Sequence, residues 1–553
     1  MSFEAHVGEI FNLRPICNRP SRYLALLLLA ALIACSHTPA RSGPERLAII
    51  PFENLTNDPA LDWVGPASAA VLAYDLTGPQ NVQPLRAATI RDARLDYSTR
   101  RIEGYFTNRN GELQLRAVVE DPQTRRTVRT IAISASPANI AAPMNQLAKN
   151  LNSGARALGN CDTSALRAYG QAVGTGGDLQ TAVQSDPHCI PLYLGQAESS
   201  LSRGDKETAA TAAAAGLAQP NLDPIDRAEL DYLAATAKND SGARLQALDK
   251  LASLLPSDAS LQQGLGELQL AGRDFQASVR SYERAARANP NDGALWNTLG
   301  YARAQLHDLA GAREALDRYR SISAPHDANA LDSLGEVSFY CGDFAAAENY
   351  FLQANQKSES SAELLKAAEA RMMTGNLAGA DTLVARARGL TPLAAAEWQF
   401  LTGRRQKAIA QLQALPQSPP VVVQLALWNA QTGKGPVPQP SQAPLSRAVS
   451  MLLAGNFQAA TPLLEQIYTA TNPTNDGQVR TLLAWSYVRT NRPEAARKLL
   501  ELYPIPLATS GNDEFLASLV FPKFVALRGE VLGSDKDRRL AAQYAGDLPD
   551  HIQ

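Results

Sequence analysis

The clearest pattern of apolar positions in this chain lies between residues 291 and 304. Trp296, Leu299 and Gly300 fall on one face of a helix, and Ala304 continues that face one turn later. We expect this face to be buried. The missing side chain at Gly300 should let a second helix approach closely.

A second helix is predicted after a short break in the pattern. Ala312 and Leu316 mark its apolar face, and Pro325 ends it because proline cannot continue a helix. The two helices form a hairpin, and one hairpin alone cannot bury its own apolar face. We therefore expect copies of it at a fixed spacing.

Copies of the hairpin recur about every 34 residues. A Leu-Gly pair marks the first helix of each copy and becomes Ala-Ala in the last one. The pairs are Leu265-Gly266, Leu299-Gly300, Leu334-Gly335 and Ala367-Ala368. This period and these positions resemble the tetratricopeptide repeat. The resemblance implies a mainly α fold, a solenoid of helical hairpins, and a binding scaffold whose ligand it does not identify.

The repeats divide the chain unequally. The strongest copies occupy residues 259–392, within an array that we expect to run from 164 to 505. The stretch 506–553 resembles the closing segment of arrays carried by bacterial sensor kinases and winged-helix regulators. We expect it to cap the solenoid, because a terminal repeat needs a polar outer face.

Residues 46–158, which precede the array, predict a small α/β domain. Three alternating stretches, 101–107, 112–120 and 127–134, are separated by turn sequences and predict an antiparallel meander. A buried strand, an alanine-rich helix and a second strand precede the meander, and a helix from 140 to 151 closes the domain.

This domain resembles the TolB amino-terminal-type domain. The resemblance is carried by four stretches, which are 49–56, Asp62-Trp63, 102–104 and 118–121. It implies no catalytic residue.

The first 35 residues predict export. Arg19 and Arg22 lead into an apolar run, 23–34, that is short for a membrane span but suits a signal peptide. The run ends in Leu-Ile-Ala-Cys-Ser, which resembles a bacterial lipobox and implies that Cys35 is lipidated. An ordinary secretory signal and an uncleaved anchor are the alternatives.

The lipobox implies a lipoprotein of the bacterial cell envelope. Residues 36–45 would form a polar tether, and the mature chain would face the periplasm. We expect the outer membrane, because Ser36 is not the aspartate that commonly retains lipoproteins on the inner membrane.

Cleavage before Cys35 would leave three cysteines in the exported chain besides the lipidated Cys35. Cys161 and Cys189 could form a disulfide, and Cys341 would then be the odd thiol. Small core positions between closely packed helices account for all three equally well.

Charge and motifs exclude several classes of function. A formal charge of −2 and a pI near 6.4 argue against nucleic acid as a partner. The sequence holds no phosphate-binding glycine loop, HExxH motif or nucleophile elbow, and it predicts no enzyme, no cofactor and no metal. The pair His188-Cys189 lacks metal-ligand spacing. Four aspartates recur at the turns between helices, where we expect them to bond to backbone N–H groups; they are Asp205, Asp274, Asp308 and Asp343.

These features favour a non-enzymatic protein–protein interaction scaffold anchored in the bacterial envelope. Its partners would be proteins or peptides, and a lipid would hold it to the membrane. The alternative is a sensor or regulatory ectodomain that acts with a separate kinase or transcriptional effector. An enzyme with an unrecognised site ranks third.

The resemblance also implies where a partner binds, because the first helix of each tetratricopeptide hairpin lines a concave surface. The positions off its packing face are Gln263, Glu267, Asn297, Tyr301, Gln305, Asp332, Glu336, Phe339, Tyr340, Glu369 and Met372. This set lacks the lysines and arginines that would clamp a C-terminal carboxylate. A segment with apolar anchors and some positive charge suits it better. A merely solvated inner face is the alternative.

The lipobox yields a direct test. Metabolic labelling with a palmitate analogue should mark the wild-type chain and not the Cys35→Ala variant, which should also leave the membrane fraction. Unchanged labelling and fractionation of the variant would contradict lipidation at Cys35.

Overall fold

The structure, a computed structural model, describes residues 43–95, 97–158, 161–175, 179–439, 443–473, 476–501, 505, 507 and 514–545. The chain divides into two units, Met1–Gly43 and Pro44–Gln553. The predicted signal peptide, the lipobox with Cys35 and most of the tether lie outside the described residues. Within the described residues, no helix is both long and apolar enough to cross a bilayer.

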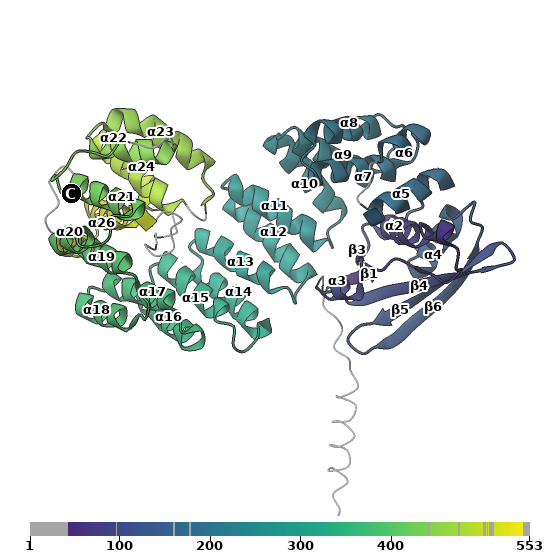
Figure 1. Cartoon of the computed structure of the whole chain (residues 1–553), viewed down its shortest axis with the longest axis horizontal. Helices are drawn as coiled ribbons and strands as arrows, with labels where there is room; N and C mark the ends of the chain where they lie inside the picture. The colour runs from purple at the N-terminus through teal and green to yellow at the C-terminus, as the bar shows by residue number, and fades with distance from the viewer. Residues whose placement is uncertain are drawn as a thin grey trace, which may run out of the picture. The chain divides into compact units, whose positions relative to one another are not determined.

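The described chain begins with a sheet whose strand order is β3-β1-β4-β5-β6, with β2 paired to β4 (Figure 1). The strands are β1 (Glu45–Ile49), β2 (Glu53–Asn54), β3 (Val82–Arg86), β4 (Arg100–Arg109), β5 (Glu112–Asp121) and β6 (Arg126–Ala135). Strand β1 lies parallel to both β3 and β4, while β4, β5 and β6 are antiparallel neighbours. The predicted meander is confirmed.

Helices accompany this sheet. They are the 3₁₀ helix η1 (Pro59–Leu61), α2 (Val64–Leu76), α3 (Ile90–Leu95) and α4 (Ala141–Leu151). On β5, Leu113, Leu115 and Ala117 alternate with more exposed residues and are buried. Helix α2 is buried on almost every side, because it packs against α4 and against the first helix of the array. Its alanines make this close packing possible.

The rest of the described chain is an array of helices, mostly in hairpins (Figure 1). The first are α5 (Thr163–Thr175), α6 (Gln180–Ser185), α7 (Ile190–Ser202), α8 (Lys206–Leu217), α9 (Pro224–Ala237) and α10 (Ser241–Leu254). The strongest copies follow as α11 (Ala259–Ala271), α12 (Phe275–Ala288), α13 (Gly293–Gln305), α14 (Leu309–Ile322), α15 (Asn329–Tyr340), α16 (Phe344–Ser358), α17 (Ser361–Met373) and α18 (Leu377–Arg386). The last are α19 (Pro392–Leu401), α20 (Arg405–Gln413), α21 (Pro419–Gln431), α22 (Pro444–Leu453), α23 (Phe457–Ala470), α24 (Gly477–Arg489), α25 (Pro493–Leu500), α26 (Glu514–Val531) and α27 (Asp535–Ala545). The fold is mainly α, a tetratricopeptide-like solenoid preceded by a small domain with a sheet, as predicted.

Close helix packing in the strongest copies depends on a glycine in the first helix. A Cβ atom at Gly300 would lie 2.7 Å from Leu316 Cγ in the partner helix, and one at Gly335 would lie 2.5 Å from the Phe351 ring. Gly266 faces the Tyr282 ring in the same way. In each hairpin the large side chain comes 16 residues after the glycine. The predicted role of Gly300 is confirmed.

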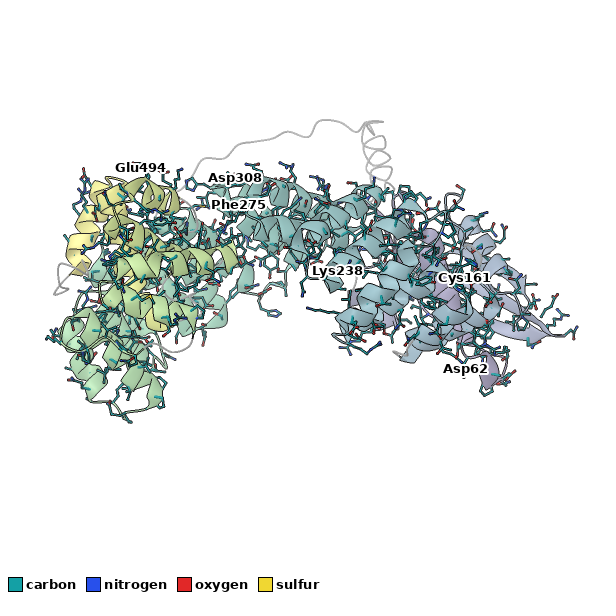
Figure 2. All side chains as sticks on the ribbon, turned by 90° about the horizontal axis from the view of Figure 1, so that it is seen from above. Asp62, Cys161, Lys238, Phe275, Asp308 and Glu494 are labelled. Atoms are coloured by element: carbon teal, nitrogen blue, oxygen red, sulfur yellow. A yellow bond between two sulfur atoms is a disulfide. The ribbon has the colours of Figure 1, made fainter. Side chains whose placement is uncertain are left out.

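The turn aspartates act as predicted. Asp205, Asp274, Asp308 and Asp343 each cap the following helix, and each side chain accepts a hydrogen bond from the backbone N–H three residues later. Asp308 lies at such a turn in Figure 2. These contacts satisfy N–H groups that the helix itself leaves unpaired.

Trp296 differs from the prediction. It is only half-buried, and its indole Nε1 donates to the carbonyl oxygen of Pro290 at 3.0 Å. The buried residues of α13 are Leu295, Leu299, Gly300, Ala302 and Ala304, so the other three predicted positions are buried as expected. The indole N–H needs a hydrogen-bond acceptor, which the backbone before the helix provides. The ring therefore covers the edge of the core and is not fully buried in it.

Cys161 and Cys189 form a disulfide, with their Cα atoms 4.6 Å apart. The bond ties the chain before α5 to the residue that precedes α7, and it closes a loop of 28 residues. Of the two alternatives that the sequence left open, the bridge is the one observed. Cys341 is a free thiol, and burial raises its pKa to about 11, so it stays protonated at neutral pH.

A distant contact joins the start of the strongest copies to the end of the array. Arg273, in the turn between α11 and α12, forms an ion pair of 2.7 Å with buried Asp476 before α24. Its guanidinium also donates to the Tyr468 carbonyl oxygen at 3.0 Å and lies over the Tyr468 ring. Arg273 takes a left-handed backbone conformation (φ 62°), at a turn position that is glycine in other copies such as Gly342. We call this contact the Arg273 clasp.

Helix α26 is buried and carries a lysine. Its side chains Phe521, Phe524 and Val525 are in the core, and it contacts α19, α24 and α27. Lys523 is only 3 % exposed, with Nζ 4.5 Å from the centre of the Trp485 ring. Burial, together with the nearby Arg489, lowers the pKa of Lys523 to about 7.

This lysine predicts a pH dependence of stability. Between about pH 7 and pH 10 the unfolded chain holds a proton at Lys523 that the folded chain lacks, so stability should rise with pH in that window. Relative to Lys523→Met, the wild type should gain roughly 2 kcal/mol between pH 7 and pH 9 in urea denaturation.

Exposed Lys238 on the end of α9 provides the control (Figure 2). The difference in unfolding free energy between wild type and Lys238→Met should not change over the same pH range. If the difference in unfolding free energy between wild type and Lys523→Met is also constant with pH, Lys523 stays charged in the folded chain.

Candidate functional site

The first helices of the strongest copies lie side by side. Helix α13 packs on α15 as well as on its own partner α14. Hydrogen bonds from Tyr301 and from Lys366 to Glu336 join α13, α15 and α17 into one face. We call it the inner face.

Four of the predicted residues, Tyr301, Asp332, Glu336 and Tyr340, take part in the contacts on this face. Glu267 is exposed, and seven others are half-buried, which are Gln263, Asn297, Tyr301, Gln305, Asp332, Glu336 and Tyr340. The remaining three, Phe339, Glu369 and Met372, are buried.

These three positions are a correction to the prediction that they face a ligand. The Phe339 ring packs edge-on against Phe344 at 5.1 Å between ring centres. Phe339 and Met372 belong to one apolar core with Leu507 and Phe521 from the end of the chain. The helical spacing alone put them on the inner face, but residues more than a hundred positions later complete a core around them.

A polar network ties α13, α15 and α17 together. Tyr301 donates its hydroxyl to Glu336 Oε2 at 2.6 Å. Lys366 Nζ donates to Glu336 Oε1 at 2.7 Å and to the two Asp332 oxygens at 2.9 and 2.8 Å. Tyr340 donates more weakly to Glu336, at 3.4 Å.

Burial and mutual charge set the ionisation of this network. Burial and then Glu336 raise the pKa of Asp332, and Lys366 opposes that rise. Burial by itself lowers the pKa of Lys366, but Glu336 and Asp332 raise it by more than burial lowers it. The net shift is upward, so the lysine stays charged. Burial and Glu336 raise the pKa of Tyr301 well above its usual value, so its phenol remains a hydrogen-bond donor.

The inner face has an excess of negative charge and of acceptors. Asp332 and Glu336 both pair with one lysine, Lys366, and Glu363 is near enough to raise the pKa of Asp332. Within the described part of α13 and α17, the acceptor atoms Asn297 Oδ1, Gln305 Oε1 and Glu363 Oε2 are buried without a hydrogen-bond partner. A partner that brings N–H donors or positive charge would complement this surface.

The sequence reasoning missed Lys366 and described the face as lacking lysine and arginine. The spacing of 33 residues places Glu369 opposite Glu336, whereas Lys366, about one turn earlier in α17, reaches both acids. A signal was present: Lys366 comes 34 residues after Asp332, the same spacing as between other copies. Because two carboxylates hold it, Lys366 does not form a carboxylate clamp.

No metal centre accompanies the inner face. In the part of the chain that the structure describes, no group of three or more His, Cys, Asp or Glu side chains could hold a metal ion. Cys189, next to His188, is engaged in the disulfide.

Comparisons with known proteins point to one kind of repeat. A family model described as Tetratricopeptide repeat matches residues 451–509. The chain is 32 % identical over 82 residues to the TPR repeat-containing protein PA0015 of Pseudomonas aeruginosa, covering 15 % of this chain and 78 % of that protein. It is 27 % identical over 186 residues to the Peroxisomal targeting signal receptor of Eremothecium gossypii, covering 32 % of this chain and 30 % of the receptor.

Several solved structures are also similar. A MamA protein structure is 22 % identical with a TM-score of 0.27, and the match covers 31 % of this chain and 92 % of that one. A tetratricopeptide repeat protein from Parabacteroides merdae is 11 % identical with a TM-score of 0.33, covering 54 % of this chain and 98 % of the other.

The ion pairs of the inner face predict a stability effect. Lys366→Met leaves Asp332 and Glu336 without their partner in a site where each side chain is at most one-fifth exposed. At pH 7 the free energy of unfolding should fall by about 2 kcal/mol in urea denaturation. At pH 4 the loss should shrink, because the carboxyl groups then take up protons.

Arg320, which pairs with Asp317 on the exposed side of α14, serves as the control. Arg320→Met should cost less than about 0.5 kcal/mol. Equal losses for the two variants would mean that the inner-face pairs are no stronger than surface pairs.

Proposed function

Because this chain is a tetratricopeptide-repeat protein, we propose that it is a non-enzymatic scaffold that binds a segment of a partner protein on its inner face. The relative from Eremothecium gossypii is named a targeting signal receptor, which supports a protein or peptide as the partner of this chain.

The proposal rests on the hydrogen-bonded network of Tyr301, Glu336 and Lys366 with its neighbours Asp332 and Tyr340. Two half-buried tyrosines offer apolar area with hydroxyl groups at the rim, as anchor sites at interfaces do. The surrounding carboxylates outnumber the one lysine. The partner segment therefore carries lysine or arginine beside an apolar anchor.

The same proposal includes a place in the cell. We infer that the protein is an envelope lipoprotein. Lipidated Cys35 would anchor it in the outer membrane, with the rest of the chain facing the periplasm. The disulfide between Cys161 and Cys189 supports an oxidising compartment, because such bonds are rare in the reducing cytosol.

The proposal is tested by capturing partners from membranes with the full-length chain as bait. The double variant Tyr301→Ala, Tyr340→Ala removes both tyrosines of the inner face and should lower the recovery of a specific partner about tenfold. Recovery should also fall as salt is raised, since the attraction is partly electrostatic.

Tyr319→Ala is the matched control, because Tyr319 is a half-buried tyrosine on α14, away from the network. It should leave recovery unchanged. Helical content is compared by circular dichroism for all variants. A folded double variant that recovers the same partners in the same yield rules out this part of the inner face.

A further inference from the structure

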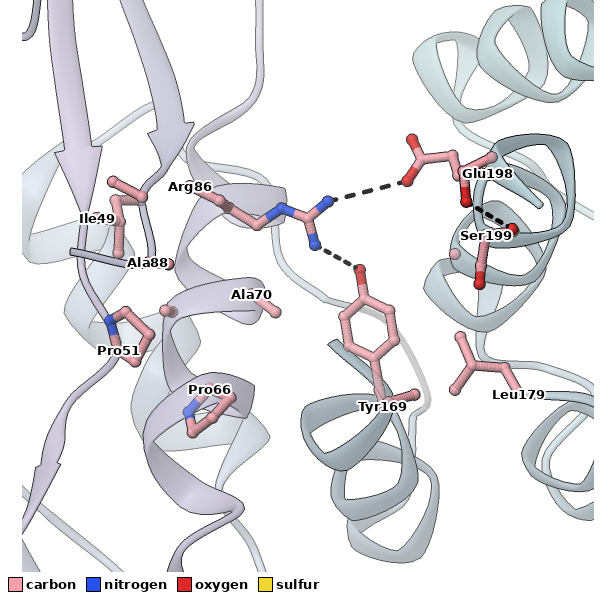
Figure 3. Close-up of a pocket in the computed structure, with 15 residues that line it drawn as sticks. Ile49, Pro51, Pro66, Ala70, Arg86, Ala88, Tyr169, Leu179, Glu198 and Ser199 are labelled. Carbon is pink, nitrogen blue, oxygen red and sulfur yellow. Dashed lines mark hydrogen bonds and ion pairs between the residues drawn. The ribbon is translucent and has the colours of Figure 1, made fainter. Parts of the chain in front are cut away.

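A hollow of about 600 Å³ lies beside the sheet, where β1 and β3 end and the first helices of the array begin (Figure 3). Its walls are mostly small and apolar, with Pro51 after β1, Ala70 on α2, Ala88 after β3 and Leu179 before α6. A space of this size matches the pockets that hold small molecules in proteins.

The hollow lies where parallel sheets commonly hold ligands. Strands β1 and β3 run parallel, and the last pair in their register is Ile49 with Arg86. Both residues line the hollow. In open α/β sheets the carboxyl ends of parallel strands leave a crevice that the following loops shape into a binding site.

Arg86 lies at this hollow and interacts only weakly with the side chains beside it. Arg86 Nη1 donates to the Tyr169 hydroxyl at 3.3 Å, and Arg86 Nη2 lies 3.8 Å from Glu198 Oε2, too far for a hydrogen bond (Figure 3). The side chains of Arg86 and Glu198 are 44 % and 43 % exposed. A guanidinium has five N–H donors, and within the described chain the hydrogen bond given for this one is that to Tyr169.

The neighbouring groups hold Arg86 in place without neutralising it fully. A Cβ atom at Gly195 would lie 2.8 Å from the Tyr169 ring, so the glycine lets that ring reach Arg86. Glu229 on α9 is the other nearby acid. Burial and then Glu198 raise the pKa of Glu229 to about 8, so it is largely uncharged at neutral pH and repels an anion little.

We propose that this hollow binds a molecule with a carboxylate head and a compact apolar body. The carboxylate pairs with both terminal nitrogens of Arg86 and takes the place of Glu198, while the apolar body fills the space between Pro51, Ala70 and Leu179. Planar two-point pairing with a carboxylate is the interaction for which a guanidinium is shaped. A free carboxylic acid and the C-terminus of a peptide share this chemistry.

The test is calorimetric titration of the full chain with octanoate. Arg86→Met should weaken octanoate binding about tenfold or more, since it removes a charge-assisted pair. Ala88→Phe, at an exposed position on the rim, should weaken binding by filling the hollow while leaving Arg86 in place. Arg91→Met, which removes an exposed arginine on α3, should change the affinity by less than about twofold.

Further ligands distinguish the source and the sign of charge. An acetylated Ala-Ala-Leu peptide that binds more tightly than octanoate, and loses binding when its C-terminus is amidated, supports the same site with a peptide end as its natural occupant. Octylamine binding more tightly than octanoate would overturn the proposal. So would equal effects of Arg86→Met and Arg91→Met, or no binding of either carboxylate at millimolar concentration.

Discussion

The contact between a glycine in one helix and a large side chain in its partner governs the strongest part of this array. At Gly300 and Leu316 the two helices are so close that a methyl group would not fit. The same distance in sequence separates Gly335 from Phe351. Three hairpins close through this glycine, and the next copy, which has Ala368 at that position, keeps the spacing of the first helices. Side chains 30 to 35 residues apart can therefore meet in a network such as that of Tyr301, Glu336 and Lys366.

Features that depend on local chemistry could be predicted from the sequence. The meander follows from alternation and turn residues, and the cap at Asp308 follows from its place before a helix. Features that depend on distant contacts could not. The helical spacing of Phe339 predicts an inner-face residue, but Phe339 belongs to a core that includes side chains from the end of the chain. Trp296 shares the period of the buried face, but its indole N–H donates to the Pro290 carbonyl oxygen at the edge of the core.

The candidate sites show the same division. Helical spacing placed Asp332, Glu336 and Tyr340 on the inner face, because one period describes all first helices. The hollow at Arg86 had no such signal, since its walls come from a strand end, α2, α5 and α7, which are joined only in the folded chain. Arg156 belongs with it in this respect: it pairs with Asp226 on α9 at 2.9 Å, a contact across 70 residues.

The Arg273 clasp limits how this array can evolve. Arrays of this kind lengthen by duplicating a hairpin, and an open array can accept the extra copy at little cost because each repeat contacts only its neighbours. Here Arg273 and Asp476 are 203 residues apart and meet in one ion pair. A duplicated hairpin between them would move the two ends of that pair apart and leave buried Asp476 with Arg480 of its own helix as its ion-pair partner. A change in the number of repeats between α11 and α24 would therefore break this ion pair, whereas copies added outside that interval would leave it intact.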